Sequence, residues 1–320
     1  NPVKVHYARM FWLALFGLFH FYFIWLGDIL FLYAIMGCLA FAFRKWEAGR
    51  LLKWGLIFYV IGAIGYALLM SGMLFLQQAA TAPGASAEAV QQYREMMEPF
   101  SAAAAQEEMA RYRSSYSAIV THKLTEQRWE PFAFLLQAFV ETLPLMMIGM
   151  ALLKNGFVTG SAEPAQYRRW ARGGIVIGGL GTALIAWVQY QSGFNPLIVF
   201  NAQVAWNAVP RLLMTLGYCA ALLLIIRHIA NSGFVARVAA AGQAAFTNYL
   251  GTSIVMTTIF YGYGLGLYGH VNRASLWLFV IGAWAVMLLW SKPWLTRYRY
   301  GPLEWLWRSL ARMKIQPLRR

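Results

Sequence analysis

Charged residues are scarce in this chain of 320 residues, because Asp, Glu, Lys and Arg together make up 12% of it. Soluble domains carry about twice that share. Hydrophobic residues account for 60% and aromatic residues for 16%, and the mean hydropathy is +0.50. This composition excludes an ordinary soluble domain and predicts an integral membrane protein.

Cysteine is almost absent as well. Cys38 and Cys219 each lie alone inside an apolar run. Two isolated cysteines give neither the ligand spacing of a metal site nor a disulfide framework. We therefore expect both to be packing residues and no metal site. A bound cofactor is not expected either.

Acidic residues are the scarcer kind of charge, with 12 Asp and Glu against 27 Lys and Arg, for a net charge of +15. In a soluble protein this excess would suggest nucleic-acid binding. Here the basic residues lie in short loops between apolar runs, where they act as topology signals. We therefore expect membrane lipids as partners and no nucleic acid.

Long apolar runs fill most of the sequence. A helix needs about 20 apolar residues to cross the core of a bilayer. The chain therefore predicts an all-α integral membrane protein, a polytopic bundle of about eight transmembrane helices. The expected spans lie at about 8–26, 28–43, 51–76, 131–153, 171–190, 208–227, 243–263 and 274–291.

The charges of the loops predict one orientation. Basic segments at 44–53, 154–172 and 227–237 and the tail from Lys292 alternate with segments poor in positive charge. Basic loops are enriched on the cytoplasmic side of membranes. We therefore expect these four segments, and with them the C-terminus, in the cytoplasm.

Four regions follow from this pattern. Residues 1–76 hold the first transmembrane helices, and because the chain begins with Asn-Pro rather than Met, we expect this region to be incomplete. Residues 77–130 are polar, with a helix N-cap expected at Ser86, and predict a small extracytoplasmic cap of two or three helices. Residues 131–291 form the transmembrane core. Residues 292–320 mix Trp and Leu with Arg and Lys, which is typical of a cytoplasmic interfacial helix.

Three charge-capable residues interrupt the first apolar segments. Arg9 and His20 are eleven residues apart, which places them on one helix face, about 16 Å apart. Asp28 follows Gly27 at the expected outer mouth. A carboxylate beside an imidazole can orient the ring and prepare it to accept a proton or act as a nucleophile. The alternative is structural: Arg9 snorkels to the interface, Asp28 caps the next helix and His20 is a satisfied core histidine.

A carboxylate also interrupts the fourth apolar run, where Glu141 lies three residues before Pro144. Because a charge at bilayer depth is costly, Glu141 should face the interior of the bundle and is a functional candidate. The alternative role is that of a structural partner for a buried arginine, for which Arg211 is the candidate.

Two further segments carry polar side chains into apolar surroundings. Asn248 and Thr252 lie one helical turn apart, and such groups more often join membrane helices than catalyse. The segment 189–211, which includes Asn201 and Arg211, is too polar for a plain span and too apolar for a free loop. Re-entrant or cavity-lining backbone would suit it.

Four segments resemble those of a known family. They are "LFGLFHFYFIWLGDILFLYAIMG", "FVETLPLMMIGMALLKNG", "FTNYLGTSIVMTTIFYGYGLGLYG" and "RYRYGPLEWLWRSL". They are similar to segments of the YeiB-like proteins of the bacterial inner membrane, domain of unknown function 418. That family in turn resembles transmembrane acyltransferases, which move an acyl group from a cytoplasmic donor to a sugar or lipid beyond the membrane. The type-three members carry an arginine and a histidine at the spacing of Arg9 and His20.

The resemblance implies an acyltransferase as the favoured hypothesis. His20, helped by Asp28, would act as a base or transient acyl carrier, while Arg9 would attract an anionic donor such as acyl-CoA. The acceptor would be an envelope sugar or lipid. The candidate catalytic residues are His20, Asp28 and Glu141, and the candidate substrate-binding residues are Arg9, Asn201, Arg211, Asn248 and Thr252. Two alternatives stay open: a transporter or flippase for a small polar or lipid-linked metabolite, and a non-catalytic membrane partner protein that binds through 77–130.

Overall fold

A computed structural model describes residues 2–320, and within this range the chain is helical without a β-strand. An isolated antiparallel bridge joins Tyr298 to Arg319 near the C-terminus. The chain divides into two compact units, each assembled from segments distant in sequence. The first unit holds Asn1–Ala42, Gln106–Ala138 and Ile229–Arg320, and the second holds Phe43–Ala105 and Phe139–His228.

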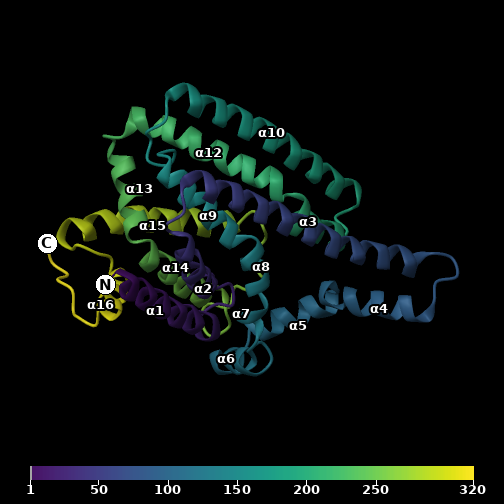
Figure 1. Ribbon diagram of the computed structural model, residues 1–320. Coiled ribbons are helices and arrows are strands. Elements are labelled where there is room, and N and C mark those ends of the chain that lie inside the picture. The colour runs from purple at the N-terminus through teal and green to yellow at the C-terminus, as the bar shows by residue number, and fades with distance from the viewer. Residues whose placement is uncertain (1) are drawn as a thin grey trace. The chain divides into compact units, whose positions relative to one another are not determined.

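The first unit is built around the N-terminal helix. In it α1 packs against α2, α6 and α16, while α13 packs against α14 and α15. Figure 1 shows these helices in purple for the N-terminal pair and in green to yellow for the C-terminal group. The bounds are α1 (Pro2–Phe23), α2 (Leu30–Ala40), α5 (Ala102–Tyr112), α6 (Tyr116–Thr125), α7 (Glu130–Ala133), α13 (Gly233–Gln243), α14 (Ala245–Phe260), α15 (Leu276–Arg297) and α16 (Pro302–Arg312).

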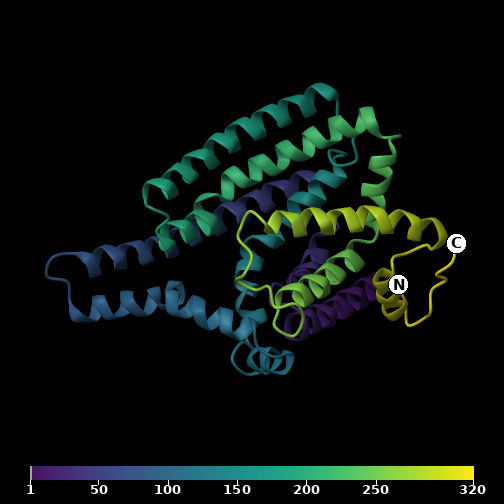
Figure 2. The same ribbon diagram turned by 180° about the vertical axis from the view of Figure 1, so that it is seen from behind.

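The second unit is built on the longest helix of the described chain, α3 (Ala48–Thr81), which packs along α9. Helices α10 and α12 lie side by side in both views (Figure 1 and Figure 2). Their close approach depends on glycine, because a Cβ at Gly174 would lie 2.9 Å from Gly217 Cα. The remaining bounds are α4 (Ala87–Met97), α9 (Thr142–Lys154), α10 (Pro164–Gln191), α11 (Pro196–Asn201) and α12 (Ala208–Ile229). Helix α8 (Leu135–Val140) begins in the first unit and ends in the second, since the boundary follows Ala138.

The helix lengths confirm a helical membrane protein. Four described helices are long and apolar enough to cross a membrane, namely α3, α10, α12 and α15. They cover the expected spans at 51–76, 171–190, 208–227 and most of 274–291. A fifth span is present if the bent segment Glu130–Val140 with Thr142–Lys154 counts as one.

Two expected spans are interrupted in the structure. The run 131–153 is divided, since α8 ends at Val140 and α9 begins at Thr142, with a sharp bend at the break. Pro144 in the first turn of α9 supplies the cause, because proline cannot donate the helical hydrogen bond to the preceding turn. The run 243–263 begins at a break as well, since Ala244 separates α13 from α14.

The polar stretch 77–130 is helical, as the sequence predicts. Ser86 Oγ accepts a hydrogen bond from the backbone N–H of Ala89 at 3.2 Å, which is the expected N-cap of α4. Helices α5 and α6 follow it. The two units divide this stretch, since Ala105 ends a segment of the second unit and Gln106 begins one of the first.

Candidate functional site

A histidine and an aspartate meet where α1 turns into α2. His20 is fully buried in the last turn of α1, and its Nδ1 lies 2.9 Å from Asp28 Oδ1. The other carboxylate oxygen, Asp28 Oδ2, accepts the backbone N–H of Phe31 at 2.9 Å in the first turn of α2. Asp28 therefore contacts the imidazole through one oxygen and the first turn of the next helix through the other.

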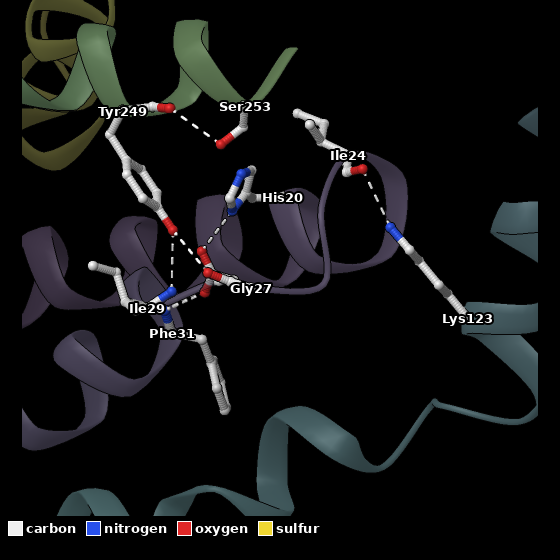
Figure 3. A network of polar contacts seen from close by, with 9 residues as sticks. His20, Ile24, Gly27, Ile29, Phe31, Lys123, Tyr249 and Ser253 are labelled. Carbon is white, nitrogen blue, oxygen red and sulfur yellow. Dashed lines mark hydrogen bonds and ion pairs between the residues drawn. The ribbon is translucent and has the colours of Figure 1, made fainter. Parts of the chain in front are cut away.

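The geometry assigns the two ring nitrogens of His20 different states. A carboxylate only accepts hydrogen bonds, so the proton of a neutral imidazole lies on Nδ1, facing Asp28. His20 Nε2 is then an acceptor, and it is buried without a hydrogen-bond partner among residues 2–320. Figure 3 shows the ring of His20 beside the side chains of Tyr249 and Ser253, which both belong to α14. An oriented imidazole with one open acceptor is the arrangement that a general base requires.

The turn that carries Asp28 is held from two sides. From α14, the Tyr249 hydroxyl donates to the carbonyl of Gly27 and accepts the N–H of Ile29, each at 3.3 Å. From α1, Gly17 permits close contact, because a Cβ there would overlap the backbone nitrogen of Phe31. The ring centroids of His20 and Tyr249 are 5.1 Å apart. These contacts fix the position of Asp28 beside His20.

A buried lysine supports the same turn. Lys123 on α6 is 1% exposed, and its Nζ donates to the carbonyl of Ile24 at 3.3 Å (Figure 3). Burial lowers the pKa of Lys123 to about 8. The ammonium group therefore ties the end of α1, directly after His20, to the polar stretch 77–130.

Two cavities of the first unit border this turn. The larger, about 760 Å³, is lined in part by Trp25, Gly27 and Ser253. The smaller, about 270 Å³, is lined in part by Gly27 and Asp28. Because Trp25 and Ser253 are also neighbours of the imidazole, His20 lies directly behind the wall of the larger cavity.

Arg9 lies on the same helix as His20 but makes separate contacts. Its guanidinium lies 4.5 Å from the ring centroid of Trp307 on α16. The indole Nε1 of Trp307 in turn donates to the Arg9 carbonyl at 2.9 Å. These two contacts join α16 to the first half of α1.

Glu141 and Arg211 form an ion pair within the second unit. The pair borders a cavity of only about 10 Å³, which Tyr59 also lines. This arrangement matches the structural role considered in the sequence, in which Glu141 is the partner of an arginine. The structure places His20 and Asp28 in the first unit and this pair in the second.

The remaining candidates make mainly structural contacts. Asn248 donates from Nδ2 to the carbonyl of Ala241 at 3.0 Å and to Ser291 Oγ at 3.3 Å, and its Oδ1 accepts from Trp290 Nε1 at 2.9 Å. It therefore joins α13, α14 and α15. Thr252 donates to the Asn248 carbonyl at 2.7 Å and lines the larger cavity.

Asn201 ends α11, just before a π-helical turn at Ala202–Trp206. The segment 189–211 is therefore mostly helical. Asn201 is fully buried, and its Nδ2 donates to the Leu197 carbonyl at 2.9 Å. Its Oδ1 is buried without a hydrogen-bond partner in the described part of the chain.

Three residues near His20 were missed from the sequence, namely Trp25, Lys123 and Tyr249. Trp25 and Tyr249 resemble ordinary membrane-span aromatics, and Lys123 lies in a polar stretch where lysine is unremarkable. The spacing of Tyr249 and Ser253, four residues apart on one helix, was the available signal.

Comparison with known proteins identifies the family of this chain. Residues 152–314 of this helical membrane protein match the family described as "Protein of unknown function (DUF418)", and the chain belongs to this family. It is 28% identical over 316 residues to the "Uncharacterized protein YxaH" of Bacillus subtilis (strain 168), covering 99% of this chain and 74% of that protein. It is also 28% identical over 320 residues to the "Uncharacterized protein YeiB" of Escherichia coli (strain K12), covering 95% and 74%. No solved structure matches the chain.

Proposed function

We propose that this protein is a membrane acyltransferase in which His20 and Asp28 supply the base. The observation that carries the proposal is the open acceptor Nε2 of a buried imidazole whose Nδ1 is held 2.9 Å from a carboxylate. A histidine held in this way is prepared to take a proton from an acceptor hydroxyl or amine. The larger cavity beside it offers the space for that acceptor.

The proposed step balances without a further reactant. The acceptor group attacks the carbonyl carbon of an acyl thioester such as acyl-CoA, and its proton passes to His20 Nε2. The bond between the acyl carbon and sulfur breaks, and the leaving thiolate takes up that proton. Asp28 stabilises the imidazolium that forms in between. Arg9 and the basic cytoplasmic segments attract the phosphates of the donor.

We also propose how the chain is oriented in the membrane. The protein has about eight spans in the bacterial inner membrane, with 77–130 as an extracytoplasmic cap and the C-terminus in the cytoplasm. The alternation of basic and less basic loops supports it. Single cysteines introduced by Ala87→Cys and Lys314→Cys, in a chain with Cys38 and Cys219 replaced by serine, test it. A membrane-impermeant maleimide added to whole cells should label the first variant and spare the second, and the reverse pattern would overturn the orientation.

The reaction is tested with the purified protein, radiolabelled acyl-CoA and an extract of envelope lipids and sugars. We expect a labelled product from the wild-type protein and from His228→Gln, whose side chain is exposed. We expect about 10²-fold or greater loss in His20→Gln, which is the scale of general-base catalysis. Equal transfer by all three proteins would contradict the proposal. No transfer, together with proton-driven flux into liposomes that Glu141→Gln abolishes, would favour the transporter.

A further inference from the structure

The cavity of about 760 Å³, the larger of the two that border the Asp28 turn, has an aromatic group in its lining. Its aromatic residues are Trp25, Tyr112, Phe260, Tyr261 and Tyr268. Its one carboxylate is Glu108, and among the described residues that line it there is no lysine, arginine or histidine. The chain as a whole is basic, with 27 basic and 12 acidic residues. The charge of this lining therefore has the opposite sign to the net charge of the chain.

The aromatic part of the lining is a packed cluster. The ring centroid of Tyr112 lies 4.8 Å from that of Tyr261 and 5.1 Å from that of Tyr268. Tyr112 is 3% and Tyr261 5% exposed. The segment after α14 is fixed to α5 because the N–H of Gly262 donates to the Tyr112 carbonyl at 2.8 Å. The rings are therefore held in place before any ligand enters.

Glu108 gives this cluster a negative charge. Its carboxylate accepts a hydrogen bond from the Tyr268 hydroxyl. Across residues 2–320, no lysine or arginine nitrogen lies within 4.0 Å of it. Arg113 lies beside the same cluster, where its Nε donates to the Tyr268 carbonyl at 2.7 Å, and it forms no ion pair with Glu108. Burial, and next the charge of Glu108, raise the pKa of Tyr112 to about 12, so this phenol stays neutral at physiological pH.

We propose that this cavity binds an organic ammonium group, through the π faces of Trp25 and the tyrosines and the charge of Glu108. Aromatic faces attract cations through the negative charge of the ring face. A volume of about 760 Å³ is enough for a larger molecule that carries such a group. The inference rests on the proposed function in one respect: since Trp25 and Ser253 line the same cavity beside His20, the ammonium group belongs to the acyl acceptor.

The test is a calorimetric titration of the purified protein in detergent with choline. The control ligand is its neutral carbon isostere, in which a tert-butyl group replaces the trimethylammonium group. We expect choline to bind at least about tenfold more tightly than the isostere, because the two differ in charge and not in shape. Glu108→Gln should weaken choline about tenfold and leave the isostere unchanged. Glu107→Gln, the exposed neighbour that is outside the described lining, should change neither.

Equal affinities for choline and its isostere would overturn the proposal, as would unchanged choline binding by Glu108→Gln. Glu108 is exposed to solvent, so this variant is expected to fold, and Trp25→Leu provides a second test with the same expected loss. Failure here and failure of the proposed reaction are distinguishable. Choline binding without acyl transfer removes the transferase and leaves the site, whereas transfer to a neutral acceptor without a preference for choline removes the site and leaves the transferase.

Discussion

Glu141 and Arg211 form an ion pair that joins the break between α8 and α9 to the first turn of α12. Beside it, the Tyr59 hydroxyl donates to the Ala208 carbonyl at 2.9 Å, which ties α3 to the same turn. Charges in apolar surroundings are tolerated when they are paired. The pair therefore stabilises the second unit at the point where one expected span is interrupted.

Removing one member of this pair should cost more than removing both. We expect Arg211→Met to destabilise the protein by about 1–3 kcal/mol, since Glu141 loses its partner. Glu141→Gln combined with Arg211→Met should recover part of that loss. Thermal unfolding in detergent measures both. A double variant less stable than either single variant would show that the pair has no such coupling.

The absence of a Cβ at Gly17 is expected to be essential for the position of Asp28. In Gly17→Ala, the new methyl group would overlap the Phe31 nitrogen and lie 2.8 Å from Asp28 Oδ2. Overpacking of this kind costs about 1–3 kcal/mol. Gly251→Ala, where a Cβ meets no atom within 4 Å, should be neutral or slightly stabilising. Thermal unfolding compares the two, and equal midpoints would contradict the close packing of α1 on α2.

The contact between Arg9 and Trp307 should hold α16 in place. Trp307→Phe removes the hydrogen bond to the Arg9 carbonyl and weakens the stacking of the guanidinium. We expect faster hydrogen exchange in α16 and in the first half of α1. Trp305→Phe is the matched control, because the Trp305 Nε1 donates to the Gln316 carbonyl instead. Exchange that is equal in both variants would mean that the contact to Arg9 is not what retains α16.

The buried ammonium of Lys123 predicts a dependence of stability on pH. Its pKa is about 8 in the folded protein, against an ordinary value of 10.5. Between these values the unfolded chain binds more protons than the folded one, so the free energy of unfolding rises with pH. Lys123→Met should lack this rise. Unfolding by denaturant across that pH range measures it, and parallel curves for both proteins would contradict the lowered pKa.

The sequence was sufficient to predict contacts that charge or short spacing makes necessary. His20 and Asp28 are eight residues apart across one turn, and the pairing of Glu141 with Arg211 was one of the two roles considered for that carboxylate. The support around His20 could not be predicted in this way. Tyr249 and Lys123 reach that turn from more than ninety residues away in sequence, and only tertiary packing decides which faces of their helices meet it.

The exact ends of the helices could not be predicted from the sequence either. The bend at Glu141 and the break at Ala244 fall inside segments that the sequence predicts as continuous spans. Glu304 illustrates the reason. Its carboxylate accepts hydrogen bonds from the N–H groups of Phe246 and Thr247 at 2.7 and 3.0 Å. It therefore caps α14 from a helix that lies more than fifty residues later in the sequence. A cap supplied by a distant segment leaves no local pattern of the kind that capping residues usually provide.

The most direct test of the account is a double-mutant cycle on the rate of acyl transfer, using His20→Gln, Asp28→Asn and the double variant. Asparagine can still accept the Phe31 N–H, so Asp28→Asn keeps the helix cap and removes the charge. If the two residues act as one unit, each single variant should lose about 10²–10⁴-fold and the double variant little more than the worse single one. Losses that multiply, or wild-type transfer by Asp28→Asn, would contradict the claim that the carboxylate prepares the imidazole for catalysis.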